Sequence, residues 1–253
     1  ALEVSQRLLE KHEYALKSEV IVRADYPINR LTPVTSKPTQ EIYRLIATGS
    51  CNLQENSSDV HGFRSMKMIG VEVTGITTCP CGQELMKERA ISTMRNMGLS
   101  DSIISTIIEK IPLATHNQRG TGRLFVGFSG EDIKKRVEAD DLIDIVEQSM
   151  SSPIYSLLKR PDEGEVIWRS HINPRFVEDV VRYMVSSLTM TDLPESSFIF
   201  ASQKNYESIH RHNAYAEIYG FLGSFKSEMA GHPSPQESSG DISSWIRLVH
   251  LIK

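Results

Sequence analysis

The sequence has no long apolar run, no excess of positive charge and only three cysteines. Its most apolar stretches, residues 101–111 and 176–185, are far shorter than the roughly 20 apolar residues that span a bilayer. The 28 Lys and Arg residues are outnumbered by 32 Asp and Glu residues, and a net charge of -4 offers no basic field to nucleic acid. We therefore expect no membrane span and no nucleic-acid partner, and no secretory signal is visible.

The cysteines Cys51, Cys79 and Cys81 indicate a reducing compartment. Their number is odd, and one residue separates Cys79 from Cys81, which is poor geometry for a mutual disulfide. A cytoplasmic location is therefore expected. The Cys-Pro-Cys pair has two interpretations: two small buried residues, or one metal-binding thiolate beside a nucleophile or proton donor.

Hydrophobic patterning predicts an α+β fold in a chain that, with 253 residues and 40% hydrophobic content, can bury a large core. Apolar residues with helical spacing predict helices at residues 2–12, 84–97, 100–110, 141–150 and 174–188. Alternating patterns predict strands at residues 15–26, 41–47, 66–77, 123–128, 196–203, 214–221 and 245–252. The second and third helices are expected to form a helical hairpin. Asn173 and Pro174 are expected to cap and begin the last helix. Residues 51–63 and 226–244 are expected to be loops.

Histidines form the second group of candidate functional residues. Alternate side chains of an extended chain share a face, so His210 and His212 would point the same way. A solvated polar turn is the alternative for this segment. His116 lies in a dense block of hydrogen-bonding residues just before a predicted strand, although a single histidine is more often structural than a ligand.

Two carboxylates also have two interpretations each. Glu163 has the pattern of an ordinary loop residue. Glu178, beside apolar residues of a predicted helix, either faces solvent or projects into a pocket to accept two N–H groups from a ligand. A thiolate, imidazoles and a carboxylate together form the ligand set expected of Zn(II) or Fe(II), with one position open for water.

Five motifs follow one another along the chain: GVEVTGITTCPC at residues 70–81, THNQR at 115–119, KRPDE at 159–163, NPRFVED at 173–179 and ESIHRH at 207–212. In this order they resemble the motifs of the prokaryotic GTP cyclohydrolases of type IB and their archaeal relatives. The helical hairpin expected between Cys81 and His116 makes the sequence similar to the archaeal group, which belongs to methanopterin biosynthesis.

The resemblance implies a tunnelling fold, in which modules of antiparallel sheet and helix assemble into barrels with active sites between subunits. Family members carry two modules per chain. Residues 1–60 would hold an incomplete first module and a linker, and residues 61–253 the second module, with a hairpin insertion at about 82–111 and a C-terminal tail. A homo-oligomer, specifically a tetramer, is implied.

The resemblance also implies a metal-dependent GTP cyclohydrolase. The implied metal ligands are Cys79, His116, Glu163 and His210. The metal would be Fe(II), with Zn(II) or Mn(II) as alternatives. Glu178 would anchor the guanine of GTP, and Gln118 and Arg119 would also bind substrate. Proton transfer or covalent assistance would fall to the catalytic residues Cys81 and His212. Glu207 would position these two residues or bind substrate, and positioning them is also the alternative role for Gln118 and Arg119.

The implied reaction begins when a metal-activated hydroxide attacks C8 of guanine. The imidazole ring then opens, with Cys81 or His212 as the general acid, and C8 leaves as formate. The archaeal relatives end at 7,8-dihydroneopterin 2',3'-cyclic phosphate and the bacterial type at dihydroneopterin triphosphate, for folate or deazaguanine synthesis. Arg30, Lys37 and Arg119 are candidates for the triphosphate.

Two other functions remain open from the sequence. One is a nitrile reductase of the same fold, which anchors a purine-like base and uses a cysteine nucleophile with NADPH but no metal. The other is a non-catalytic protein that binds a purine or a metal. The grouping of cysteine and histidine motifs argues against the first, and the presence of all five motifs argues against the second.

Overall fold

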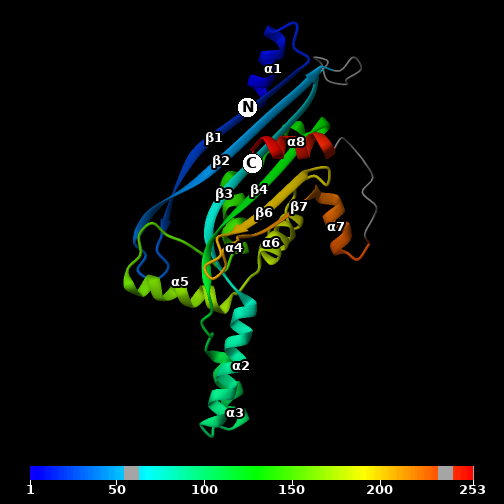
Figure 1. The fold of residues 1–253 in the computed structure, drawn as a ribbon. Helices are drawn as coiled ribbons and strands as arrows, with labels where there is room; N and C mark the ends of the chain where they lie inside the picture. Colours follow the sequence, from blue (N-terminus) through cyan, green and yellow to red (C-terminus); the bar gives the residue numbers. More distant parts are fainter. Residues whose placement is uncertain (54–62, 233–241, 253) are drawn as a thin grey trace.

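A computed structural model describes residues 1–53, 63–232 and 242–252 and shows an α+β fold built on an antiparallel sheet (Figure 1). In the described part, the seven-stranded sheet has the order β1-β2-β3-β4-β6-β7, and the short β5 pairs with β3. The strands are β1 (Lys17–Leu31), β2 (Pro38–Leu53), β3 (Phe63–Thr78), β4 (Asn117–Ser129), β5 (Ser152–Pro153), β6 (Phe198–Asn205) and β7 (Ala214–Phe221). The predicted fold class is confirmed, and the sheet is consistent with a tunnelling fold.

The strand β1 runs past Pro27, where the sequence predicted its end. Proline lacks the N–H that a central strand needs, but β1 lies at one edge of the sheet and pairs with β2 alone. The predicted loop at 51–63 is shorter at both ends, because Leu53 belongs to β2 and Phe63 to β3; residues 54–62 lie outside the described part. Since β1 and β2 continue the sheet of β3, the number of modules stays a prediction.

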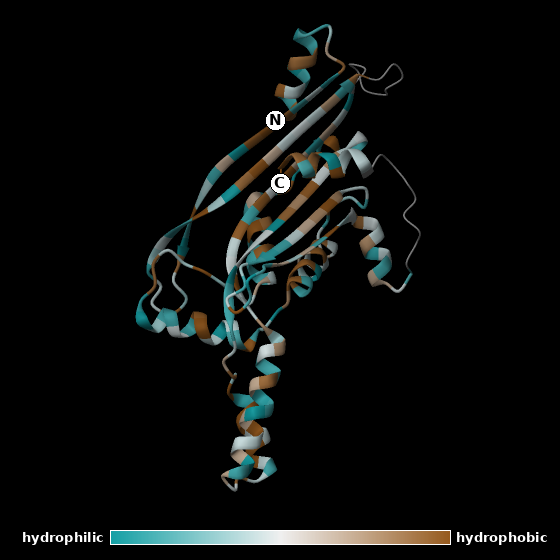
Figure 2. Ribbon diagram, viewed as in Figure 1, coloured by the Kyte–Doolittle hydropathy of each residue, from teal (hydrophilic) through white to brown (hydrophobic). Residues whose placement is uncertain are grey.

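Helices cover both faces of the sheet. On one face, α4 (Ala139–Ser149) and α6 (Val177–Thr189) pack against Val71, Val73 and Leu124. On the other face, α8 (Ile242–Ile252) packs against Met66 and Met68. The two faces use alternate side chains of β3, as the pleat requires, and Figure 2 shows hydrophobic and hydrophilic residues alternating along the strands.

The predicted strand at 245–252 is wrong, because this segment is α8. Its buried residues Trp245, Leu248, Val249 and Ile252 follow the i, i+3, i+4, i+7 spacing of a helix. The ring of Trp245 stacks on Phe198 with centroids 5.1 Å apart. The predicted tail also contains α7 (Leu222–Met229), and residues 233–241 lie outside the described part.

The helical hairpin is confirmed as α2 (Pro80–Asn96) and α3 (Asp101–Lys110). Gly98 follows α2 with φ of 82°, a left-handed conformation that suits glycine at a helix end. Figure 1 shows the hairpin projecting from the end of the sheet opposite α1 (Leu2–Lys11). No helix in the described part is long and apolar enough to cross a membrane.

The sequence did not predict α5 (Arg160–Ile172), and it started α6 too early. Asn173 ends α5, and its side-chain amide donates to the carbonyl oxygens of Met150 and Ser151 instead of capping the next helix. The cap of α6 comes from Asp179, which accepts the backbone N–H of Phe176 at 2.9 Å. The short helix η1 (Gly130–Lys134) follows β4.

Candidate functional site

The Cys-Pro-Cys motif forms the turn between β3 and α2. Cys79 is the N-cap of α2, and its sulfur accepts the backbone N–H of Gly82 at 3.4 Å. Pro80 occupies the first helical turn, where a missing N–H is tolerated. Cys79 is half-buried and Cys81 is exposed, and all three cysteines are free thiols. The motif is therefore a strand-to-helix turn in which the two thiols differ in exposure.

Backbone contacts fix the end of β3 from two sides. The N–H of Thr78 donates to the Ser151 hydroxyl at 3.1 Å, and its carbonyl accepts the N–H of Arg175 at 3.0 Å. The Arg175 guanidinium donates to the carbonyl of Ser149 and lies 3.9 Å from the ring centroid of Tyr183. Part of the motif at 173–179 therefore has a structural role, which is to hold the strand that leads into Cys79.

His116 lies beside the cysteine turn. The backbone N–H of Cys79 donates to the carbonyl of His116 at 3.1 Å, which extends the pairing of β3 with β4 by one residue. The imidazole Nδ1 lies 3.0 Å from Oε1 of Gln118, and Nε2 of that glutamine donates to the Thr77 hydroxyl at 3.1 Å. Gln118, which the sequence predicted to bind substrate, is buried behind His116, and both ends of its amide are in hydrogen bonds.

The segment between β6 and β7 brings Glu207, His210 and His212 to the same place. The nearest Glu207 oxygen lies 3.9 Å from Nδ1 of His116, too long for a hydrogen bond. The rings of His116 and His210 are nearly perpendicular with centroids 6.3 Å apart, and His210 stacks on His212 at 5.1 Å. Two imidazoles therefore gather next to a third, although His210 and His212 are exposed.

The helix α5 reaches this site by its C-terminal end only. Its residue His171 is buried, with Nε2 3.3 Å from the carbonyl of Thr115, and the amide of Gln83 donates to the His171 carbonyl at 2.7 Å. Glu163 lies at the other end, eight residues earlier, which is about 12 Å along a helix. The structure therefore does not bring Glu163 together with Cys79 and His116.

Asp162 anchors that distant end of α5. Its buried carboxylate accepts hydrogen bonds from the backbone N–H groups of Val34, Thr35 and Lys159 and from the Thr35 hydroxyl. Burial raises the pKa of Asp162, but these hydrogen bonds outweigh it and hold the pKa well below its usual value. The turn between β1 and β2 therefore fixes where Glu163 lies.

The remaining predicted substrate residues are exposed. Glu178, in the first turn of α6, forms no hydrogen bond or ion pair with any described residue, and it is close in sequence to Arg175, which holds the β3 end. Arg119 is exposed at the start of β4 and points to the opposite face from Gln118. Across residues 1–53, 63–232 and 242–252, no three His, Cys, Asp or Glu side chains lie close enough to hold one metal ion.

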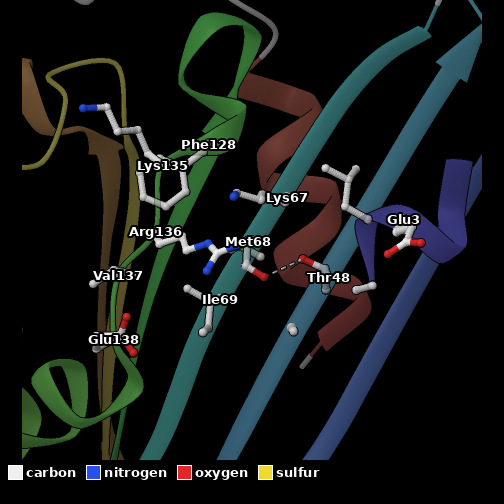
Figure 3. A pocket seen from close by; sticks show the side chains of 13 residues that line it. Glu3, Thr48, Lys67, Met68, Ile69, Phe128, Lys135, Arg136, Val137 and Glu138 are labelled. Atoms are coloured by element: carbon white, nitrogen blue, oxygen red, sulfur yellow. Dashed lines mark hydrogen bonds between the residues drawn. The ribbon is translucent and has the colours of Figure 1, made fainter. Parts of the chain in front are cut away.

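Two other regions are poor candidates for substrate chemistry. Arg30 donates to Asp144 at 2.5 Å and to Glu147 at 3.4 Å, so its charge is already paired. A cavity of about 440 Å³ lies between β3, α1 and the segment after η1, lined by residues such as Lys67 and Arg136 (Figure 3). None of the predicted site residues lines this cavity.

Sequence reasoning missed two residues that shape the site, Thr77 and Gly82. Thr77 was hidden inside a strand motif, and its role depends on the register that pairs it with Gln118. Gly82 follows Cys81 directly, and a glycine in the first turn of a helix is a signal of close approach by another segment. A Cβ atom there would lie 2.2 Å from the Thr115 hydroxyl.

Comparison with known proteins matches the whole site region. The family model described as "Type I GTP cyclohydrolase folE2" matches residues 1–216. GTP cyclohydrolase MptA 1 of Methanocella arvoryzae is 42% identical over 230 residues, which cover 90% of this chain and 70% of that protein. GTP cyclohydrolases MptA of Methanococcoides burtonii and Methanosarcina mazei are 40% and 39% identical over 230 residues, again 90% of this chain and 70% and 71% of theirs. With five motifs in order, an antiparallel α+β fold and this match, the chain belongs to the type I GTP cyclohydrolase family.

Proposed function

We propose that the chain is a metal-dependent GTP cyclohydrolase that opens the guanine imidazole ring, releases C8 as formate and forms 7,8-dihydroneopterin 2',3'-cyclic phosphate for methanopterin biosynthesis. The observation that carries the proposal is that Cys79, His116, His210 and Glu207 lie at the same end of the sheet. These residues come from three motifs of the family that lie far apart in the sequence. The match to relatives named GTP cyclohydrolase MptA supports the cyclic phosphate over a pterin triphosphate.

The donor groups suit a divalent metal, with Fe(II) as our first choice and Zn(II) or Mn(II) as alternatives. Cys79 offers a half-buried thiol, and His116 offers Nε2 because Nδ1 already has a hydrogen-bond partner. His210 is the third ligand of the proposed set. A bound metal would lower the pKa of a water molecule and supply the hydroxide that the reaction at C8 needs.

The other side chains act on the substrate and on protons. Glu178 accepts hydrogen bonds from the guanine ring N–H and the exocyclic amine, a bidentate arrangement for which a free carboxylate is suited. Cys81, exposed one residue beyond Cys79, and His212, stacked on His210, are the groups that give a proton to the opening ring. Glu207 lies near His116 and helps to orient its imidazole. Arg119 is exposed and can bind the phosphates of GTP.

The test of the proposed function is anaerobic incubation of the protein with GTP in the presence of Fe(II), Mn(II) or Zn(II). Formate is measured, and the pterin is identified by mass. Formate with a pterin cyclic phosphate supports the proposal. Formate with a triphosphate would reject the archaeal product, and absence of formate with every metal would reject the activity.

We also propose that Glu163 completes the metal site of a second copy of the chain in a homo-oligomer, with the tetramer as the form that the family resemblance implies. Asp162 holds Glu163 about 12 Å along α5 from the end that contacts Thr115, so the carboxylate does not reach its own Cys79 turn. A neighbouring subunit would bring the missing ligand.

Mixed oligomers test this arrangement. Cys79→Ala and Glu163→Ala proteins are each expected to be inactive, and co-expression of the two is expected to restore part of the activity, because some sites then combine an intact Cys79 with an intact partner Glu163. Co-expression of Cys79→Ala with His116→Ala is the control and is expected to stay inactive. Equal recovery in both mixtures, or in neither, would contradict the shared site.

A further inference from the structure

We propose that Gln118 is a positioning residue that holds His116 in the tautomer able to bind the metal. The inference rests on the proposed function, because it concerns the metal of that same site. It gives Gln118 a role behind the imidazole, in place of the substrate contact expected from the sequence. Gln118 is 8% exposed and its anchor Thr77 is fully buried, so neither is free to meet a ligand in the open site.

The first step is the direction of the glutamine amide. Nε2 donates to the Thr77 hydroxyl at 3.1 Å, which leaves Oε1 as the group 3.0 Å from Nδ1 of His116. An amide oxygen can only accept, so Nδ1 must carry the proton. Neutral His116 then has its lone pair on Nε2, the form of imidazole that binds a metal.

The second step is the surroundings of the imidazole, which favour the same tautomer. A Glu207 oxygen lies 3.9 Å from Nδ1, so negative charge adds to the acceptor at that nitrogen. The side chains of His116 and Glu207 are only 14% and 10% exposed, and water therefore weakens this attraction little. With the amide turned over, Nδ1 would have to accept a hydrogen bond beside a carboxylate.

The third step is where Nε2 faces. The Cδ2 atom of His116, which is bonded to Nε2, is the ring atom nearest the Cβ position of Gly82, at 3.3 Å. Gly82 donates to the sulfur of Cys79. The edge of the imidazole that Gln118 leaves unprotonated therefore faces the cysteine turn, where the second proposed ligand lies.

Substitutions at Gln118 separate this role from a purely structural one. Gln118→Met keeps the length and volume but removes the acceptor, and Gln118→Glu keeps an acceptor at Nδ1. Gln203→Met is the matched control, because Gln203 is also a buried glutamine, it lies on the adjacent β6, and its amide donates to Asn205. The dissociation constant for Zn(II) is measured by chelator competition, with the melting temperature alongside.

Gln118→Met is expected to weaken Zn(II) binding by about 10- to 100-fold, the range found when outer partners of metal-binding histidines are removed. Gln118→Glu is expected to retain affinity within a few-fold, and Gln203→Met to change the melting temperature without changing affinity. Nitrogen-15 spectra of the His116 ring are expected to show a protonated Nδ1 in the wild type and a mixture of tautomers in metal-free Gln118→Met.

Wild-type affinity in Gln118→Met, or equal loss in Gln118→Met and Gln118→Glu, would overturn the positioning role. Failure of the proposed function gives a different result. In that case the wild type would bind no Zn(II), or Cys79→Ala and His116→Ala would bind it as tightly as the wild type, and both proposals would fall.

Discussion

Gly82 packs directly against the imidazole of His116. A Cβ atom on Gly82 would lie 3.3 Å from Cδ2 of His116 and 2.2 Å from the hydroxyl of Thr115, and no Cβ atom tolerates the second distance. Because residue 82 has no side chain, the first turn of α2 and the segment leading into β4 approach closely while the Thr115 hydroxyl keeps its position. This contact joins the cysteine motif to the histidine motif.

Gly82→Ala is expected to push Thr115 and His116 away from the cysteine turn and to lower the metal content and turnover together. The ratio of metal to protein after reconstitution checks this. Gly164→Ala is the control, because Gly164 lies inside α5 and its Cβ position meets no described atom within 4 Å beyond its chain neighbours and the helix backbone, so alanine should stabilise the helix by about 0.5–1 kcal/mol. A Gly82→Ala protein with full metal content would show that the close approach is unimportant.

The two cysteines of the motif are expected to respond differently to alanine. Cys79→Ala should lose the metal, because it removes the half-buried thiol of the proposed ligand set. Cys81→Ala should keep the metal and lose turnover by a factor of about 10² or more, as expected for a proton-transfer group. Metal analysis and formate release distinguish the two effects.

Cys51→Ala provides the comparison for the cysteine variants. Cys51 is buried in β2 against Ser65, so its loss should lower stability and leave the metal in place. If Cys81→Ala also lost the metal, the division of roles between the two cysteines would have to be abandoned.

Glu178→Ala is expected to weaken GTP binding by about 10-fold or more, because it removes an acceptor of two charge-assisted hydrogen bonds. Metal content should stay unchanged, since Glu178 contacts none of the proposed ligands. Arg182→Ala, one turn later on the exposed side of α6, should bind GTP as the wild type does. Equilibrium binding of GTP to the metal-loaded proteins decides the matter, and equal affinities for all three would remove Glu178 from the substrate site.

Glu147 is expected to make stability depend on pH. Burial raises the pKa of Glu147 above 4.5, despite the hydrogen bond from Tyr43 at 2.6 Å and the charge of Arg30. The folded protein therefore binds the Glu147 proton more tightly than the unfolded chain does. The contribution of this proton to the free energy of unfolding is complete below pH 4.5 and is lost as the pH rises through the pKa of the folded state. Urea unfolding of metal-free protein between about pH 4 and 7 should show this decline.

Glu147→Gln should abolish that decline, since glutamine does not titrate. Glu165→Gln, an exposed substitution on α5, should leave it intact. Parallel curves for the wild type and Glu147→Gln would show that another group is responsible.

The sequence predicted the elements whose signal is local. The hairpin of α2 and α3, the strands β3, β4, β6 and β7 and the helix α4 follow from apolar spacing and turn residues within each segment. It missed α5, because the buried residues of this helix are mostly polar, Asp162, Ser170 and His171 among them, and exposed Ile167 and Trp168 blur the pattern. The predicted strand at 245–252 was wrong because the apolar residues of this segment recur with the 3.6-residue period of a helix, not with the two-residue period of a strand.

The site was predictable to the extent that strand pairing determines it. Once β3 and β4 pair, Cys79 and His116 must meet, because their motifs lie at the same end of two neighbouring strands. The location of Glu163 could not be derived in this way. It depends on a buried aspartate that contacts a turn about 130 residues earlier, with separations of 127 and 128 residues.

With Glu163 as the proposed metal ligand, the hydrogen bonds between Asp162 and the turn at Thr35 would give the N-terminal hairpin a part in catalysis, although it supplies no catalytic group. Because Glu163 follows Asp162, anything that loosens β1 and β2 also loosens the aim of this carboxylate. If Glu163 binds the metal of the neighbouring subunit, a substitution in the hairpin of one subunit impairs the metal site of its neighbour. The sequence of the hairpin turn and that of the metal centre would then be constrained together. Substitutions in this turn would be as harmful to activity as substitutions of the ligands.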